Sequence, residues 1–156
     1  MLHHTPIGGP GRGLWPDELI VECTFTEAAT KNDTVQLDLM QLSGTGTGPG
    51  NGTPFSTVRD PDTGTAPDVG LEHGVFGVAL ETVAAAGIGK VMFYGITDCN
   101  VDAATVKGDA LTAATDGQMD VITGSSGLKV IAIALEDDSS NVSKCWVNGF
   151  GWGTDG

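Results

Sequence analysis

Basic residues are scarce in this chain. Seven Lys and Arg stand against 20 Asp and Glu, which gives a formal net charge of −13 at pH 7. Because such a charge repels phosphate backbones and anionic lipid headgroups, we expect neither nucleic acid nor a membrane among the direct partners. Long apolar runs are also lacking, since Glu81 and Lys90 interrupt the best candidate for the roughly 18 uncharged residues of a spanning helix. We therefore expect a soluble protein.

Cysteine is sparse as well. Cys23, Cys99 and Cys145 are odd in number and widely separated, and no Cys-x-x-Cys pair occurs. This spacing argues against a disulfide framework and a zinc knuckle, and it predicts small buried apolar side chains. Residues 1–16 lack the basic start and apolar run of a secretion signal, so we expect synthesis in the cytoplasm.

Two segments lack the apolar periodicity of regular structure. Residues 1–16 hold four Gly and three Pro, which predicts an extended N-terminal arm. Residues 43–70 hold seven Gly and four Pro, which predicts a long Gly/Pro-rich loop. The rest of the chain has the length of one domain, so we expect a single β domain over residues 17–156 that carries this loop.

What is present is a series of short apolar segments. Residues 19–26 and 35–39 predict two strands of a first hairpin, because the second alternates apolar and polar side chains. A strand–turn–strand unit at 74–96 has a copy at the end of the chain, in which Val78-Ala79-Leu80-Glu81 recurs as Ile133-Ala134-Leu135-Glu136. After a one-residue deletion, residues 90–95 align with residues 144–149.

About nine or ten strands at this spacing are typical of an all-β protein. We expect a small antiparallel β-barrel or a β-sandwich, and no amphipathic helix of useful length is visible.

No motif is assigned a catalytic, cofactor-binding or metal-binding role. Asp98-x-Asn100-x-Asp102 with Asp109 at the twelfth position follows the order of a calcium loop, but Ala103 replaces the glycine at the sixth position. A polar loop between strands explains the same residues. Glu72-His73 has no nucleophile with a recognisable signature nearby. The equivalent residues Glu81 and Glu136 suggest a paired carboxylate, but turn polarity accounts for them equally well.

Two of the predicted strands, one ending near Ile96 and one near Gly149, carry apolar side chains on both faces. Val91 and Phe93 share one face of the first strand, and Cys145 and Val147 share one face of the second. A barrel strand has one core face, so the second apolar face must also be covered. The candidate subunit interface consists of Trp15, Met92, Tyr94, Ile96, Trp146, Phe150 and Trp152. Covering by the Gly/Pro-rich loop of the same chain is the alternative.

Several short motifs recur in one known family. They are Gly77-Val-Ala-Leu-Glu-x-x-Ala-Ala-Ala-Gly, Val91-x-x-Tyr-Gly, Val106-Lys-Gly-Asp-Ala-Leu-Thr, Asp116-Gly, Val130-Ile-Ala-Ile-Ala-Leu-Glu and Val147-Asn-Gly. Together these motifs resemble the capsid decoration (cement) proteins of tailed bacteriophages. The resemblance covers residues 74–151 and leaves residues 1–73 uncovered.

The resemblance implies a compact β-barrel or β-tulip-like knob without catalytic residues or cofactors. It implies a homotrimer on the capsid exterior of the virion that binds the major capsid protein and is assembled in the host cytoplasm. The alternative is a phage tail or fibre domain, or a carbohydrate-binding β module that uses Tyr94, Trp146 and Trp152 as a sugar platform.

Overall fold

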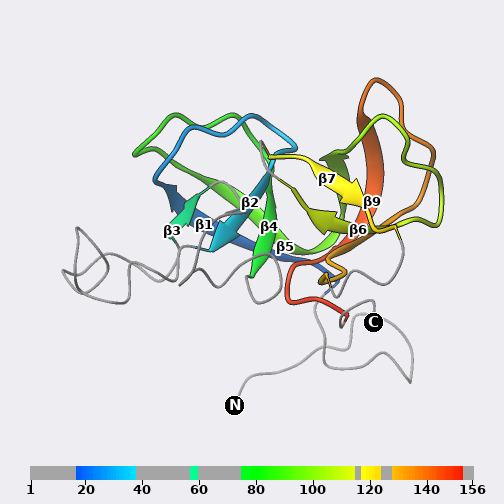
Figure 1. The fold of residues 1–156 in the computed structure, drawn as a ribbon. Helices are drawn as coiled ribbons and strands as arrows, with labels where there is room; N and C mark the ends of the chain where they lie inside the picture. The colour runs from blue at the N-terminus through cyan, green and yellow to red at the C-terminus, as the bar shows by residue number, and fades with distance from the viewer. Residues whose placement is uncertain (1–16, 38–56, 60–74, 115–116, 124–127, 153–156) are drawn as a thin grey trace, which may run out of the picture.

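The computed structural model describes residues 17–37, 57–59, 75–114, 117–123 and 128–152 (Figure 1). The predicted arm lies outside these residues, as does most of the predicted loop at 43–70. Within the described parts the chain forms strands and turns and no α-helix, and no helix there has the length and apolar character needed to cross a membrane. The strands are β1 Leu19–Phe25, β2 Thr34–Leu37, β3 Thr57–Arg59, β4 Phe76–Ala79, β5 Ile88–Asn100, β6 Ala110–Ala113, β7 Met119–Val121, β8 Ala132–Ala134 and β9 Val142–Asn148.

The all-β prediction is confirmed, and the strands form one mainly antiparallel sheet in the order β1-β3-β2-β4-β5-β9-β8-β6-β7. Two details differ from expectation. The strand β3 lies inside the segment predicted to be a loop. It also pairs with both β1 and β2, so these two strands are not hydrogen-bonded neighbours and the predicted first hairpin does not exist.

The sheet closes into two small barrels that share β5 (Figure 1). The N-terminal barrel contains β1, β3, β2, β4 and the first half of β5, and the pairing of β1 with β5 closes it. The C-terminal barrel contains the second half of β5 with β9, β8, β6 and β7. A parallel bridge between Val101 and Met119 closes this second ring.

The sequence pattern predicted that the shared strand would end near Ile96, yet β5 runs for 13 residues. Gly95 lies inside it with a φ of 137°, a conformation that glycine adopts without steric cost. Beyond Gly95 the alternation resumes, because Asp98 is exposed and Cys99 is buried. A polar-looking stretch therefore continues the strand into the second barrel.

The predicted internal repeat is confirmed by its hydrogen-bond register. Ala79 pairs with Val91 across β4 and β5, and its counterpart Ala134 pairs with Cys145 across β8 and β9. The next bond along is also repeated. The Leu80 amide donates to the Lys90 carbonyl at 2.9 Å, and the Leu135 amide donates to the Lys144 carbonyl at 2.8 Å.

The repeat extends to the whole barrel, which the sequence analysis did not detect. The pair Ile20–Met92 of β1 and β5 has its counterpart in Ile96–Trp146 of β5 and β9. Two further pairs along, Glu22–Lys90 matches Asp98–Lys144. The strands β3 and β7 also correspond. In the N-terminal barrel β3 pairs with β1 and β2, and in the C-terminal barrel β7 pairs with Val101 and β6 in the same register. The described strands therefore form a tandem structural repeat of one five-strand unit, in which the two halves of β5 belong to different units.

The turns of the two barrels repeat as well. The Asp33 carboxylate accepts a bond from the Thr30 amide at 2.6 Å, and the Asp109 carboxylate accepts one from the Val106 amide at 2.9 Å. Asn32 and Gly108, the residues before these two aspartates, both have a positive φ. Side chains that bond to their own turn in this way stabilise the reversal without help from distant residues.

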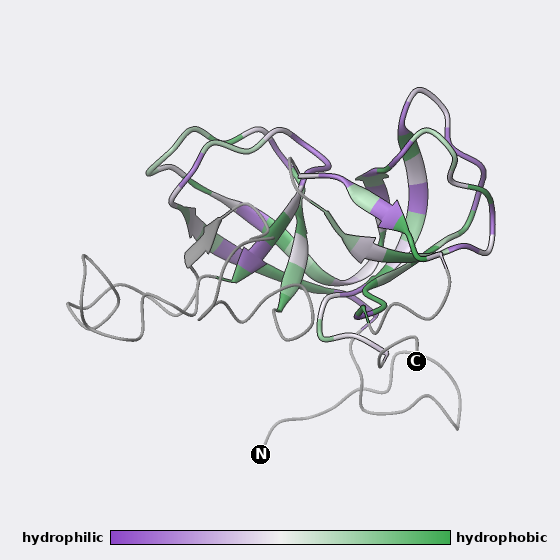
Figure 2. Ribbon diagram, viewed as in Figure 1, coloured by the Kyte–Doolittle hydropathy of each residue, from purple (hydrophilic) through white to green (hydrophobic). Residues whose placement is uncertain are grey.

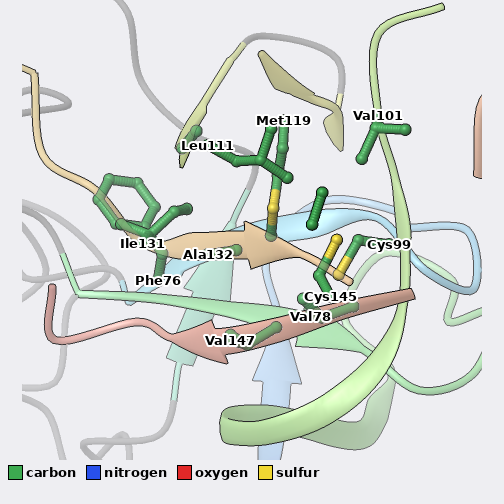
Figure 3. Close-up of a cluster of buried hydrophobic side chains, with 12 residues drawn as sticks. Phe76, Val78, Cys99, Val101, Leu111, Met119, Ile131, Ala132, Cys145 and Val147 are labelled. Atoms are coloured by element: carbon green, nitrogen blue, oxygen red, sulfur yellow. The ribbon is translucent and has the colours of Figure 1, made fainter. Parts of the chain in front are cut away.

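Each barrel has its own hydrophobic core. The core of the N-terminal barrel consists of Cys23, Phe25, Ala29, Val35, Ala79, Val83, Val91 and Phe93. That of the C-terminal barrel consists of Cys99, Val101, Leu111, Ala113, Met119, Ile131, Ala132, Ala134, Cys145 and Val147, and it also takes in Phe76 and Val78 from β4 (Figure 3). Figure 2 shows hydrophobic stretches along β4 and β5, where the two barrels meet.

All three cysteines are buried and free, as predicted, which leads to a test of the cores. Burial raises the pKa of the Cys23 thiol to about 11. A hydrogen bond with Cys145, together with burial, holds the pKa of the Cys99 thiol well above its usual range. The hydrogen bond with Cys99 lowers the pKa of the Cys145 thiol, but this side chain is fully buried. Because the two raised pKa values disfavour the reactive thiolate and burial keeps a reagent away from all three thiols, we expect no reaction of the native protein with a thiol reagent at pH 8. After unfolding in guanidinium, all three thiols should react, and a fast-reacting native thiol would contradict this packing.

Candidate functional site

The outer face of the C-terminal barrel carries a row of apolar side chains on neighbouring strands. Trp146 of β9 pairs with Ile96 of β5 on one side and with Ile133 of β8 on the other. Trp146 is 41% exposed and Ile96 is 55% exposed, while Ile133 is half-buried. Together with Tyr94 and Trp152 they form what we call the aromatic surface.

Contacts between rings hold the aromatic surface together. The Trp146 ring meets the Tyr94 ring edge-on, with ring centres 6.4 Å apart and planes inclined by 74°. Its contact with Trp152 has the same character, at 5.6 Å and 72°. Edge-to-face pairs of this kind contribute about 0.5–1.5 kcal/mol each beyond the burial of area. The three rings are therefore positioned before any partner arrives.

A tight turn at residues 149–152 places the last of these rings, and glycine makes the turn possible. The Gly149 carbonyl accepts a bond from the Phe76 amide at 3.0 Å, and the Gly149 amide donates to the Phe93 carbonyl at 2.8 Å. A Cβ at this position would lie 1.5 Å from the Phe76 carbonyl oxygen, so only glycine fits. Two residues on, Gly151 has a φ of 88° and packs against the stem of Lys129.

The same turn places Phe150 over an open cavity at one end of the N-terminal barrel. The cavity has a volume of about 320 Å³. The Phe150 ring is tilted against that of Phe93 with ring centres 6.4 Å apart. All the lining side chains are apolar: Leu19, Val21, Cys23, Leu37, Val75, Phe93 and Phe150. The turn thus connects a protruding aromatic surface to an apolar hollow.

The structure divides the residues predicted to form the interface. Tyr94, Ile96, Trp146 and Trp152 lie together in the aromatic surface, and Phe150 lies beside it at the cavity. Met92 faces the same side of β5 as Tyr94 but is only 4% exposed, so it does not belong to the exposed surface of the chain. Trp15 lies outside the described residues. Ile133 was missed, although its position beside Trp146 follows from the predicted repeat.

The polar motifs take part in turns and strand pairs. Asp98 lies opposite Lys144, the Asn100 amide donates to Asp33 at 2.7 Å, and the carboxylates of Asp102 and Asp109 bond to backbone amides of their own loop. Within the described residues no group of three or more His, Cys, Asp or Glu side chains is placed to hold a metal ion.

The two repeat glutamates also bond locally. The Glu81 carboxylate accepts a bond from the Lys90 amide at 3.0 Å, and the Glu136 carbonyl accepts one from Ser143 at 2.8 Å. The Glu72-His73 pair lies outside the described residues.

One cation lies next to the aromatic surface. Lys129 packs along Gly151, and burial lowers the pKa of its ammonium group. The stem covers apolar surface, and the ammonium group at its end is itself partly removed from water. This arrangement gives the surface a partly polar edge, as is usual where a protein interface meets solvent.

Comparison with known proteins gives matches of structure and none of sequence: no family model and no curated protein matches the chain. A chain in the structure of the capsid of the myovirus XM1 superposes with a TM-score of 0.55 at 14% identity, covering 85% of this chain and 84% of that one. The N base of the head fibre protein gp8.5 of bacteriophage phi29 superposes with a TM-score of 0.50 at 13% identity, covering 86% and 97%. The likeness is one of fold.

The close approach at Gly149 predicts a specific sensitivity to substitution. In Gly149→Ala the new methyl group collides with backbone, so the turn must move, and we expect a loss of about 3 kcal/mol in the free energy of unfolding, the upper end of the usual cost of overpacking. Urea unfolding followed by tryptophan fluorescence measures it, since the same turn positions Trp152. The matched control is Gly108→Ala, where the φ is 97° but nothing lies within 4 Å. It should lose only about 1 kcal/mol. Equal effects of the two substitutions would contradict the anchoring role of Gly149.

Proposed function

We propose that this chain is a structural protein of a phage virion that decorates and stabilises the capsid exterior by binding the major capsid protein. It acts as a homo-oligomer, a trimer by the resemblance noted above, and has no enzymatic activity. The single observation that carries the proposal is the aromatic surface on a rigid barrel whose fold is shared with two phage head structures.

The composition of the surface supports a protein partner. Trp, Tyr and other large apolar side chains are enriched in the cores of protein interfaces, and tryptophan is prominent among the residues that dominate binding energy. Exposure of Ile96, Trp146 and Trp152 on one face is costly in water unless the face is covered in the assembled state. The ring contacts reduce the ordering cost on binding, because the side chains are held in place beforehand.

The charge supports an exterior location. A net charge of −13 disfavours contact with packaged DNA, which an inner surface of a shell would require. The mechanism of stabilisation is added interface between neighbouring capsid subunits. Its apolar part contributes about 25 cal/mol per Å² buried, less the cost of ordering the contact.

The geometry gives less support to a carbohydrate-binding module. A sugar platform needs ring faces presented to the ligand side by side. Trp146 meets both Tyr94 and Trp152 edge-on, with planes inclined by 74° and 72°, so the three rings do not share a plane. Neighbouring apolar groups at Ile96 and Ile133 extend the surface in a way that suits a protein more than a polar sugar.

Co-sedimentation with shells assembled from the major capsid protein of the same phage tests the proposal. The wild-type chain should sediment with the shells and saturate them. The Trp146→Ala variant should bind about 30-fold more weakly, the effect of losing a central interface residue. Ile88→Ala is the matched control, since Ile88 is 65% exposed but lies outside the aromatic surface.

The control variant should bind like the wild type. A wild-type chain that stays in the supernatant at every concentration would exclude the proposed function. Binding that is equally strong in Trp146→Ala and Ile88→Ala would exclude the aromatic surface as its basis.

A further inference from the structure

We propose that the Trp15 side chain fills the open apolar cavity of its own N-terminal barrel and thereby attaches residues 1–16 to the end of the barrel beside the turn at residues 149–152. The side chain itself lies outside the described residues. Such a contact lies within one chain and needs no capsid. It leaves the aromatic surface free for the partner proposed above, and it can be tested separately from that partner.

The cavity is an incomplete end of a hydrophobic core. Two of its lining residues, Cys23 and Phe93, are buried in the core of the N-terminal barrel. Four aliphatic side chains pack against the same core but are only half-buried; they are Leu19, Val21, Leu37 and Val75. A hollow of about 320 Å³ leaves these side chains without contacts on one side, and an apolar group placed there would restore the lost packing.

The C-terminal barrel shows how the repeat fills the corresponding region. Three residues of the cavity have counterparts that are fully buried in the second core, and the pairs are Cys23 with Cys99, Leu37 with Ala113 and Phe93 with Val147. Phe76 of β4 packs in that core, so a ring from the neighbouring barrel helps to complete it (Figure 3). Phe150 reaches the hollow of the N-terminal barrel but is 53% exposed. Among the described residues, no further ring fills this hollow.

The position of Trp15 in the sequence brings it to the cavity. Asp17 is the first described residue, and Leu19, two positions later, lines the hollow. Trp15 precedes Leu19 by four residues, which span about 14 Å at most. Pro16 disfavours a helical conformation of the residue before it, which supports an extended approach. The Trp15 ring is therefore tethered within reach of the hollow.

The size of the hollow favours a tryptophan. An apolar cavity of about 150 Å³ holds one benzene molecule and otherwise stays dry. The larger cavity of about 320 Å³ accommodates an indole, and a single aliphatic side chain would leave part of it empty. Trp15 is the one tryptophan outside the described residues. Because the cavity is open at one end, the indole N–H can stay in contact with water while the ring is buried.

Charge supports a contact within the chain. Residues 1–16 contain Arg12 and no acidic residue, which gives a formal side-chain charge of +1. Residues 17–156 contain all 20 acidic residues and six basic ones, which gives −14. Asp17 and Glu18 are exposed directly beside Leu19 of the cavity. The opposite charges attract the segment to its own barrel, and added salt weakens this attraction without removing the apolar contact.

Tryptophan fluorescence of the full chain tests the contact. In the double variant Trp146→Phe/Trp152→Phe, Trp15 is the remaining tryptophan, and circular dichroism checks the fold. Its emission should lie at short wavelength, and acrylamide should quench it several-fold less than in the urea-unfolded chain, because the cavity excludes water and quencher. Emission and quenching equal to those of the unfolded chain would leave the hollow open or assign it to residues 38–56 or 60–74, and would overturn the proposal.

A competing ring in the cavity gives the sharper result. In the same background, Val75→Phe should displace Trp15, so the emission should move to longer wavelength and quenching should increase. Ile88→Phe is the matched control, since Ile88 is 65% exposed and does not line the cavity, and it should change neither. Leu37→Phe replaces Val75→Phe if that variant is not folded. Equal responses to the two substitutions would show that Trp15 is buried elsewhere. Protection that is lost on dilution would place the ring in a second copy, which also contradicts the contact.

Urea unfolding followed by circular dichroism gives an independent measurement in the otherwise wild-type chain. Trp15→Ala should raise the unfolding equilibrium constant about 100-fold, near the lower end of the effect of truncating a buried tryptophan. Ile7→Ala, in the same segment but eight residues farther from the barrel, is the matched control and should leave it unchanged. An unchanged stability of Trp15→Ala would count against the contact. Shell binding is measured separately, so failure here leaves the proposed virion role standing, and failure there leaves this contact standing.

Discussion

The structure depends on one strand that belongs to two closed sheets. The first half of β5 pairs with β1 and β4, and its second half pairs with β9. Side chains on the same face of this strand feed both interiors, since Val91 and Phe93 lie in one core and Cys99 lies in the other. Gly95 lies between the two sets, where its positive φ lets the strand change course without breaking. The two barrels are therefore joined both through the hydrogen bonds of one continuous strand and through the side chains of β4 that pack in the second core.

Local sequence patterns predicted where the strands lie, but they did not predict which strands pair with one another. Alternation placed Cys145 and Val147 inside and Trp146 outside, because it depends only on the geometry of one strand. The insertion of β3 between β1 and β2 brings together residues far apart in the sequence, which no local pattern encodes. A signal for the duplication was nevertheless present. Ile20-Val-Glu-Cys recurs as Ile96-Thr-Asp-Cys, and Lys31-Asn-Asp recurs as Lys107-Gly-Asp, both at a separation of 76 residues.

Strand alternation also predicted part of the candidate site. Periodicity says to which side of a strand a residue points, but it does not say what covers that side. Met92 and Tyr94 share a face of β5, yet Met92 is almost fully buried and its thioether lies against Gly95. Tyr94 is only half-buried, beside Trp146. Phe150 departs from the alternation because the turn from Gly149 to Gly151 ends the strand. It therefore reaches the cavity of the other barrel instead of the aromatic surface.

A tandem repeat has two unmatched ends by construction, and repeat proteins that remain single in water usually cover them with polar residues. Among the residues that the structure describes, neither end of this repeat is polar. The last unit presents Ile133 and Trp146 at the positions where the first unit presents Val78 and Met92, and the first unit keeps an apolar hollow at the position that is filled in the second. The chain has 20 acidic residues, and polar side chains are the usual occupants of exposed positions such as these. Large apolar side chains that stay exposed at the end of the repeat are the property expected of a face that a partner covers.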